Sequence, residues 1–376
     1  MKNIGALNVV HPRWKVLLWE KNSIEPAMLR VPIIIIVFVI MWSVALFILD
    51  KLRVDYTFVL TPKTTPIAIV FATGILLAAQ YAASMTLMWT LLGFPIETSI
   101  SLFYLLMLAL MVVPLPTAFS ETRTSFWRLL RNCFLPGSSI HFSEVLLADC
   151  FTSLSKVLKD MGISLFAMYA FMRSDSTVDY HNHAMVAIAL LASLPYYLRV
   201  RQCTVQLYGC GDLYARVPVV LNIIKYCTAF PPIWLTAYAS LGYRLENMAR
   251  LITFFATLNS LYSFLWDVIM DWGMLSISRQ GKFSLRPRIM LPAVTYFLAT
   301  LLNLALRFAW LINRLPGMDR LHSSVIVLAI ELGEVFRRSM WMLYRIEWEV
   351  IVQHDRAIEK DPVLAEKLRI NKNPSI

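Results

Sequence analysis

Long apolar runs separated by short polar segments dominate the chain. Residues 31–49 form such a run and contain no charged residue, as do residues 64–96 and 98–120. A helix that crosses a bilayer needs roughly 20 mostly apolar residues, so each run predicts one transmembrane helix. Gly93 and Pro95 supply a turn signal between the second and third helices.

The later apolar runs differ because charged residues lie within them. We place these runs at 142–172, 183–198, 217–241, 250–275, 289–313 and 323–345. Together with the first three they predict about nine transmembrane helices, with eight to ten allowed, since predicted boundaries drift by several residues. The fold class is therefore an all-α, polytopic membrane helix bundle.

Residues 121–143 predict an interfacial segment, because aromatic and leucine residues alternate there with arginines. The predicted organisation is an N-terminal tail (1–30), three transmembrane helices (31–120), this amphipathic segment (121–143), a charged helix bundle (144–346) and a cytosolic C-terminal tail (347–376).

Composition agrees with this pattern. Of the 376 residues, 58% are hydrophobic and 16% charged, and the mean hydropathy is +0.61. Soluble domains have roughly 45–50% apolar and about 25% charged residues, so a soluble enzyme, a disordered chain and a nucleic-acid-binding protein are excluded. The five cysteines have no Cys-x-x-Cys spacing and predict buried small side chains rather than a metal site.

The formal net charge of +11 indicates basic cytoplasmic loops. Basic residues concentrate in the loops 199–216 and 276–288, which the positive-inside rule places in the cytoplasm with the C-terminal tail. Nine spans then put the N-terminus in the lumen, whereas its own basic residues favour the cytoplasm. The side of the N-terminus stays open.

Charges within the predicted spans are the candidate chemistry, because a charge in hydrocarbon costs at least about 2.5 kcal/mol. Asp267 and Asp271 lie four residues apart, as do Glu334 and Arg338, which we expect to form an ion pair. Helical spacing also places a set of polar residues on one face: Asp149, Thr152, Ser153, Lys156 and Asp160.

Two interpretations compete for these charges. They can form buried ion pairs that only hold helices together, or they can line a pathway for a polar solute. Four cations favour the pathway: Lys225, Arg307, Arg337 and Arg338. The planar fork of arginine binds two oxygens of a phosphate or carboxylate, so the solute is predicted to be a tetrahedral oxyanion. Neighbouring carboxylates can accept a hydrogen bond from a P–OH group, which phosphate has and sulfate lacks.

Two tryptophans follow these arginines at helical spacing, Trp310 after Arg307 and Trp341 after Arg337. They can belong to the interfacial aromatic belt, or they can form cation–π contacts or a gating wall. No zinc, Walker, Gly-x-Ser-x-Gly or Gly-x-Gly-x-x-Gly motif is present, so we expect no metal, no cofactor and no enzyme activity.

Short motifs from about residue 117 to 361 resemble, in order and spacing, the EXS domain of phosphate exporters. They are Leu147-Ala148-Asp149 with Ser153-Leu154, Leu198-Arg199 with Gln202-Cys203, Lys225-Tyr226, Trp266-Asp267 with Met270-Asp271-Trp272-Gly273, Leu306-Arg307-Phe308-Ala309-Trp310, and Glu334-Val335-Phe336-Arg337-Arg338 with Trp341. The resemblance implies a helix bundle with a phosphate pathway inside it.

The resemblance also implies roles for single residues. Phosphate oxygens would be held by Arg307, Arg337, Arg338, Lys225 and Tyr226. Orientation of these cations, or acceptance from P–OH, would fall to Asp149, Ser155, Asp267, Asp271 and Glu334. Trp310 would gate the path.

The exporters carry a soluble N-terminal SPX domain, whereas about 30 residues precede the first predicted span here. We therefore expect the short subgroup that resembles the Golgi ER-retention-defective protein. That resemblance implies a multi-pass membrane protein of the Golgi that can also cycle through the endoplasmic reticulum. The protein would transport inorganic phosphate, which glycosylation releases in the lumen, back to the cytosol. Retention of ER luminal proteins and Golgi glycosyltransferases would depend on this phosphate transport.

The alternatives are a non-transporting receptor or scaffold for Golgi-to-ER retrieval and, with less support, a membrane enzyme acting on lipid-linked substrates. Expected partners are inorganic phosphate and the lipid bilayer, with coat adaptors or glycosyltransferases as further candidates and no nucleic acid. The sequence leaves open the oligomeric state and the choice between a channel and alternating access.

Overall fold

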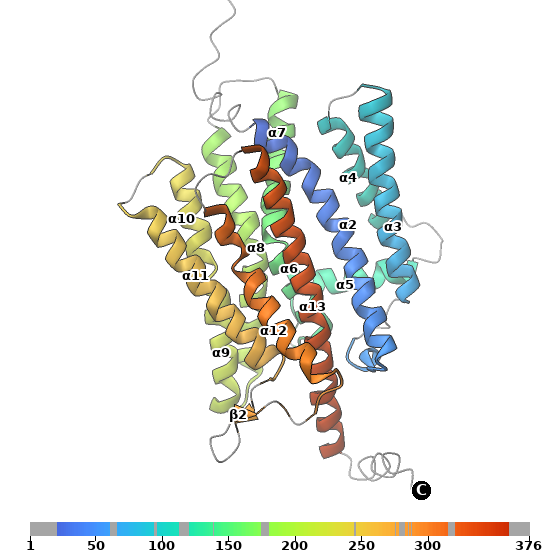
Figure 1. Cartoon of the computed structure of the whole chain (residues 1–376), viewed down its shortest axis with the longest axis vertical. Helices are drawn as coiled ribbons and strands as arrows, with labels where there is room; N and C mark the ends of the chain where they lie inside the picture. Colours follow the sequence, from blue (N-terminus) through green and yellow to red (C-terminus); the bar gives the residue numbers. More distant parts are fainter. Residues whose placement is uncertain are drawn as a thin grey trace, which may run out of the picture.

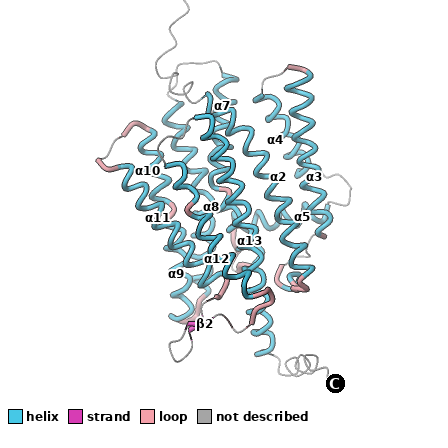
Figure 2. The backbone as a smooth tube through the Cα atoms, in the orientation of Figure 1, coloured by secondary structure: helices cyan, strands magenta, loops and turns pink. Residues whose placement is uncertain are grey.

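In the computed structural model, helices account for nearly all of the described chain (Figure 2). The structure describes residues 21–60, 66–93, 96–112, 120–137, 139–173, 180–243, 246–274, 276–277, 283–284, 286, 288–314 and 320–360. The strands in these residues are one antiparallel pair, β1 (Ser276–Ile277) and β2 (Phe283–Ser284).

In chain order the helices are α2 (Lys21–Lys51), η1 (Tyr56–Phe58), α3 (Ile67–Ser84), η2 (Met85–Leu91), α4 (Ile96–Val112), α5 (Ser120–Phe134), α6 (Phe142–Ser153), α7 (Ser155–Arg173), α8 (Tyr180–Gly209), α9 (Leu213–Cys227), α10 (Phe230–Ser240), α11 (Met248–Trp266), η3 (Asp267–Asp271), α12 (Ala293–Arg307), η4 (Ala309–Arg314) and α13 (Arg320–Lys360).

Six helical stretches in the described part of the chain are long and apolar enough to cross a bilayer. They are Ala27–Lys51, Ile67–Leu87, His183–Gly209, Leu213–Ser240, Met248–Asp271 and Ala293–Ile312. The other three predicted spans fall on α4, on the α6–α7 pair and on α13. The predicted all-α, polytopic membrane bundle is therefore confirmed, and each predicted span coincides with helical structure.

Helix α2 packs against α3, α7 and α13, which places it between two groups of helices (Figure 1). Val31 and Ile34 are buried against Val157 of α7 and Val335 of α13. The helix begins at Lys21, ten residues before the predicted span, so the last part of the predicted tail is helical. Apolar contacts continue upstream of residue 31, since Met28 is buried as well.

A break separates α6 from α7 where the sequence predicted one helix. Leu154 leaves the helical conformation with φ −92° and ψ 7°. The expectation that Asp149, Lys156 and Asp160 share one face is therefore wrong, because a shared face requires an unbroken helix. Residues before and after the break belong to two separate polar clusters, described below.

Helix α13 runs along the height of the bundle beside α2 (Figure 1). Its 41 residues would extend about 60 Å at a rise of about 1.5 Å per residue. The helix continues to Lys360, so the first half of the predicted C-terminal tail is helical, and Glu347 is buried within the bundle. Residues 361–376 lie outside the described residues.

Helix α5 falls within the predicted interfacial segment and runs across the direction of the long helices (Figure 1). It packs mainly on α6, where Cys133 is fully buried and its thiol donates to the carbonyl oxygen of Glu144 at 3.4 Å. Desolvation by burial, followed by the nearby Glu144 charge, raises the pKa of this thiol to about 12. Cys133 is thus a protonated packing residue, as the cysteine pattern predicted.

A buried ion pair fixes the segment before α12 against α13. Arg286 Nη2 lies 2.6 Å from Glu347 Oε2, and both side chains are almost completely buried. Arg286 also donates to the Trp272 carbonyl oxygen at 2.8 Å, and Tyr296 donates to Glu347. Gly273 accommodates this packing with φ +58°, since a Cβ atom there would meet the Trp348 ring at 2.4 Å.

We predict that Arg286→Gln lowers the free energy of unfolding by about 3–5 kcal/mol, because it leaves the Glu347 carboxylate buried and unpaired. Arg288→Gln is the matched control. Its partner Asp355 is about half exposed, so the loss should stay below about 1 kcal/mol. Chemical denaturation of the detergent-solubilised protein measures both, and similar losses in the two variants would contradict the prediction.

Candidate functional site

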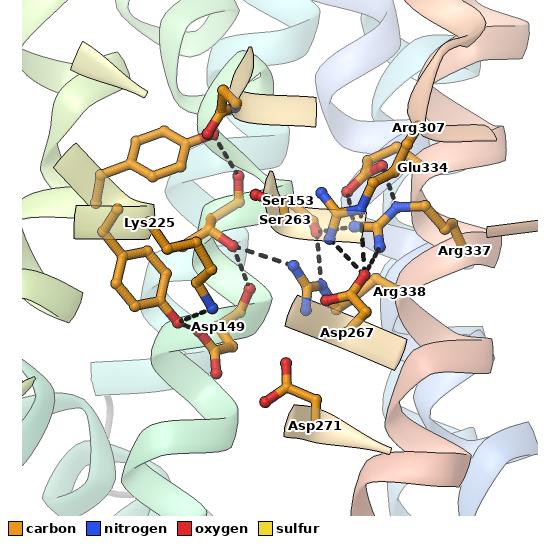
Figure 3. Close-up of a pocket in the computed structure, with 14 residues that line it drawn as sticks. Asp149, Ser153, Lys225, Ser263, Asp267, Asp271, Arg307, Glu334, Arg337 and Arg338 are labelled. Carbon is orange, nitrogen blue, oxygen red and sulfur yellow. Dashed lines mark hydrogen bonds and ion pairs between the residues drawn. The ribbon is translucent and has the colours of Figure 1, made fainter. Parts of the chain in front are cut away.

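The middle of the bundle contains a partly enclosed cavity of about 70 Å³ (Figure 3). One water needs about 10–15 Å³ on this measure, so the cavity can hold several waters or one small ion. Helices from across the chain contribute its lining, and every lining side chain is polar. The lining residues are Asp149, Thr152, Ser153, Tyr196, Lys225, Tyr226, Asn259, Ser263, Asp267, Asp271, Arg307, Glu334, Arg337 and Arg338.

Asp267 is the centre of one polar network. Its Oδ2 atom lies 2.5 Å from Arg307 Nη2 on α12 and 3.4 Å from Arg337 Nη1 on α13. Asn303 donates to the same oxygen at 3.0 Å and accepts from Arg337 at 3.1 Å. One carboxylate from η3 therefore joins three helices, and Arg307 has a close counter-charge.

Glu334 completes the neutralisation of Arg337. Its two oxygens accept from Arg337 Nε at 2.7 Å and from Nη2 at 2.6 Å, which is a bidentate pair. The predicted partner of Glu334 was Arg338, so this prediction is wrong. Arg337 binds the Glu334 carboxylate because the Arg337 side chain lies on the side of α13 that faces Asp267. Its contacts with both Asp267 and Glu334 show this orientation.

Arg338 is buried but has no carboxylate within ion-pair distance among the described residues. Its Nε atom donates to Ser153 Oγ at 2.6 Å, and Nη2 donates to Thr152 Oγ1 at 3.1 Å. The guanidinium carbon lies 4.4 Å from the centre of the Trp341 ring. Neutral hydroxyls and an aromatic face orient this cation without cancelling its charge.

Lys225 is the second buried cation of this kind in the described part of the chain. Its Nζ atom contacts the Tyr226 hydroxyl oxygen at 3.0 Å and lies over the rings of Tyr226 and Trp266. Asp149 is close by, but its Oδ1 atom is already held by Arg199 at 2.7 Å and by the Tyr226 hydroxyl at 2.5 Å. The charge of Lys225 therefore faces the cavity.

Asp271 has weaker partners than the other cavity carboxylates. Its Oδ2 atom accepts from the Trp341 indole at 3.2 Å, and its Oδ1 atom lies 3.7 Å from Arg345 Nε. Figure 3 shows this carboxylate at the cavity edge without a contact to the other residues drawn. Asp271 ends the π-helical turn η3, and such turns are common at functional sites.

The structure brings nearly all of the predicted site residues together. Asp149, Lys225, Tyr226, Asp267, Asp271, Arg307, Glu334, Arg337 and Arg338 all line the cavity.

Two of the predicted residues do not line the cavity. Ser155 begins α7 just beyond the break, and its hydroxyl donates to the Ala192 carbonyl oxygen at 2.7 Å. Trp310 lies in η4, where its indole donates to Ser260 at 3.1 Å. The gate assigned to Trp310 stays a prediction.

Several lining and supporting residues were missed. Tyr196, Asn259 and Ser263 line the cavity but are ordinary neutral residues in apolar helices. Asn303 is completely buried between Asp267 and Arg337. It lies four residues before Arg307, so helical spacing could have identified it. The cation–π contact that the spacing allowed between Trp341 and Arg337 is instead made by Arg338, one position later.

A second charged cluster lies near the break. Lys156 and Asp160 of α7 pair with each other at 3.5 Å, and both have partners outside α7. Arg30 of α2 lies 2.9 Å from Asp160 and 3.4 Å from Glu331 of α13, which also pairs with Lys156. These four residues connect α2, α7 and α13, and none of them lines the cavity.

The fold and the cavity define a multi-pass membrane protein with a buried, charged chamber of ionic size. The chain belongs to the EXS family, whose model matches residues 26–351. The match begins in α2 and ends in α13, so it also includes the first three predicted spans, upstream of the region in which the motifs resembled the family.

Curated relatives give the same family relation. Protein ERD1 homolog 1 of Schizosaccharomyces pombe is 31% identical over 237 residues, which are 59% of this chain and 60% of that protein. The Protein SYG1 homolog of the same yeast is 29% identical over 61% of this chain and 34% of its own length. Phosphate transporter PHO1 homolog 8 of Arabidopsis thaliana is 27% identical over 65% of this chain and 32% of its own. The matched segment thus covers less than two thirds of each relative.

We predict that Asp267→Asn destabilises the bundle by about 3–5 kcal/mol, since Arg307 loses its close counter-charge in a buried place. Asp271→Asn should cost less, about 1 kcal/mol, because its charge has one indole hydrogen bond, an arginine at 3.7 Å and an attraction to Lys225 that lies beyond ion-pair distance. Denaturation of the two purified variants compares them. Equal losses would show that the described contacts do not determine the importance of each carboxylate.

Proposed function

We propose that the chain carries inorganic phosphate across the membrane and is not an enzyme. The observation that supports this proposal is the pair of buried cations, Lys225 and Arg338, at a polar cavity without a carboxylate partner of their own in the described residues. A buried, unpaired charge costs several kcal/mol. A bound anion offsets that cost, so the site is suited to receive one.

The remaining charges suit a tetrahedral oxyanion rather than a metal ion. Arg307 and Arg337 both line the cavity and both contact carboxylates. Among the described residues Arg307 donates only through Nε and Nη2, which leaves its Nη1 group available, whereas all five N–H groups of Arg337 already have acceptors. Arginine presents several N–H donors in a planar fork that matches phosphate oxygens. The hydroxyls of Thr152 and Ser153 add small polar groups beside Arg338.

Asp271 supports phosphate in preference to sulfate. A loosely held carboxylate can accept a hydrogen bond from P–OH, which phosphate retains near neutral pH. Sulfate carries no such proton and would place a bare oxygen against the carboxylate charge. The carboxylates of Asp267 and Glu334 are less suited to this role, since arginines occupy them at 2.5–2.7 Å.

Relatives and motifs support the compartment in this proposal. The similarity to an ERD1 homolog and to a protein named as a phosphate transporter supports transport of phosphate from the Golgi lumen to the cytosol. On this proposal, retention of ER luminal proteins and of glycosyltransferases follows from removal of the phosphate that glycosylation releases. Coat adaptors and glycosyltransferases of the Golgi remain candidate partners.

A retrieval receptor or scaffold is the second candidate function. The tight pairing of Arg307 with Asp267 and of Arg337 with Glu334 favours it, since such contacts can serve helix packing alone. A scaffold requires the fold and its outer surfaces but not the charge of Lys225 or Arg338. The two functions therefore differ in their response to substitutions that leave the fold intact.

We predict that Lys225→Met and Arg338→Gln each reduce uptake of labelled phosphate into reconstituted vesicles by about ten- to a hundredfold. A hydrogen bond to a charged group contributes about 1.5–3 kcal/mol, and about 1.4 kcal/mol is tenfold in affinity. The control is Arg216→Gln at the exposed start of α9, which should keep normal uptake. Normal uptake in both cavity variants would favour the scaffold.

We predict that wild-type uptake resists competition by sulfate at equal concentration and that Asp271→Asn loses this resistance. An asparagine amide can donate to a sulfate oxygen, whereas the carboxylate repels it. Sulfate inhibition of labelled phosphate uptake, measured for both proteins, is the assay. Equal inhibition of wild type and variant would exclude Asp271 as the discriminating group.

A further inference from the structure

We propose that Arg199 is a positioning residue that keeps the charge of Lys225 available to the transported anion. Arg199 does not line the cavity, and the proposed phosphate function does not by itself require it. The inference rests on the proposed phosphate transport, because it concerns how the charge of Lys225 is kept available to the anion.

Arg199 occupies a buried position on α8, behind the cavity wall. Its Nε atom lies 2.7 Å from Asp149 Oδ1 and donates to the Tyr226 hydroxyl oxygen at 3.0 Å. Its guanidinium carbon also lies 4.9 Å from the centre of the Tyr226 ring. Arg199 thus contacts both Asp149 and Tyr226, the two residues that lie between it and Lys225.

The Tyr226 hydroxyl is the point where these groups meet. It donates to Asp149 Oδ1 at 2.5 Å, and its oxygen contacts Arg199 Nε and Lys225 Nζ, each at 3.0 Å. Asp149 and Lys225 are therefore separated by one hydroxyl oxygen. Asp149 is a natural counter-ion for Lys225, but its charge is directed to Arg199 instead.

Arg199 is itself held in place from outside the cavity. Its Nη1 atom donates to Gln202 Oε1 at 2.5 Å, and Gln202 donates to the Glu144 carbonyl oxygen at 3.3 Å. The Glu144 side chain accepts from Asn132 of α5 at 2.7 Å. These contacts hold the guanidinium through residues that do not line the cavity, so it does not need the anion to remain in position.

Loss of Arg199 leaves Asp149 buried with Lys225 as its strongest remaining counter-charge, ahead of Arg338. A buried carboxylate without a counter-charge is strongly unfavourable, so Asp149 is expected to pair with Lys225. The cavity then loses one of the two cations available to an anion. In a variant without Arg199, the Asp149 carboxylate is therefore the group that withdraws Lys225 from the anion. Removal of the Asp149 charge in the same variant tests the inference.

The experiment compares phosphate transport by Arg199→Gln, Asp149→Asn and the double variant in vesicles. We expect Arg199→Gln to raise the KM for phosphate about tenfold with less than a twofold change in maximal rate. The double variant should recover most of that KM, since a neutral side chain at position 149 cannot pair with Lys225. Arg201→Gln, two residues along α8, is the control and should match wild type.

Asp149→Asn alone leaves Arg199 buried without its counter-charge, so the decisive comparison is between Arg199→Gln and the double variant, which removes both charges of the pair. A double variant as impaired as Arg199→Gln would overturn the inference and leave Arg199 a structural residue. Thermal melting of each purified variant, with and without inorganic phosphate, separates these results from misfolding and gives a second readout of binding.

The proposed function fails in a different way. If wild-type protein transports no phosphate and phosphate does not raise its melting temperature, the transport proposal is wrong, whatever Arg199 contributes to folding. If wild type transports phosphate but Arg199→Gln keeps a wild-type KM, only the positioning role is wrong.

Discussion

The balance of buried charge determines how this bundle is built. A charge removed from water needs a counter-charge, hydrogen bonds or a ligand. Asp267 and Glu334 satisfy Arg307 and Arg337, and Arg199 satisfies Asp149, so specific pairs absorb most of the cost. Lys225 and Arg338 receive only neutral polar groups and aromatic faces in the described structure. The cavity therefore combines a rigid, paired framework with two cations available to a solute.

The fold keeps this arrangement within one chamber by placing further polar clusters at other levels of α13. Glu331, one turn before Glu334, joins α2 and α7 through Arg30 and Lys156, whereas Glu347 holds Arg286 beyond the other end. Trp341 lies between the cavity and the Arg286 cluster, where it contacts both Arg338 and Asp271. One long helix thus carries polar groups on both sides of the site, and motion of α13 would affect all three clusters together.

The sequence predicted the membrane bundle and most of the cavity, because both leave strong local signals. Apolar runs identify helices, and ionisable residues inside them are rare enough to indicate a functional interior. The failures concern three-dimensional detail. Spacing could not show that Leu154 interrupts the helix, so Lys156 and Asp160 were grouped with Asp149. The resemblance to the exporters placed Ser155 at the site, whereas its hydroxyl donates to the Ala192 carbonyl oxygen. Spacing also could not decide whether Glu334 pairs with Arg337 or Arg338, since both lie within one turn. Tyr196 and Asn259 were missed because neutral side chains become informative only when their neighbours in space are known.

The most direct test is a cryo-electron-microscopy structure of the protein in lipid with and without saturating inorganic phosphate. The account predicts a phosphate-dependent tetrahedral density within hydrogen-bond distance of both Lys225 Nζ and the Arg338 guanidinium, with Arg199 still on Asp149. Identical maps, with Lys225 paired to Asp149 or Asp271 and water alone between the helices, would contradict it.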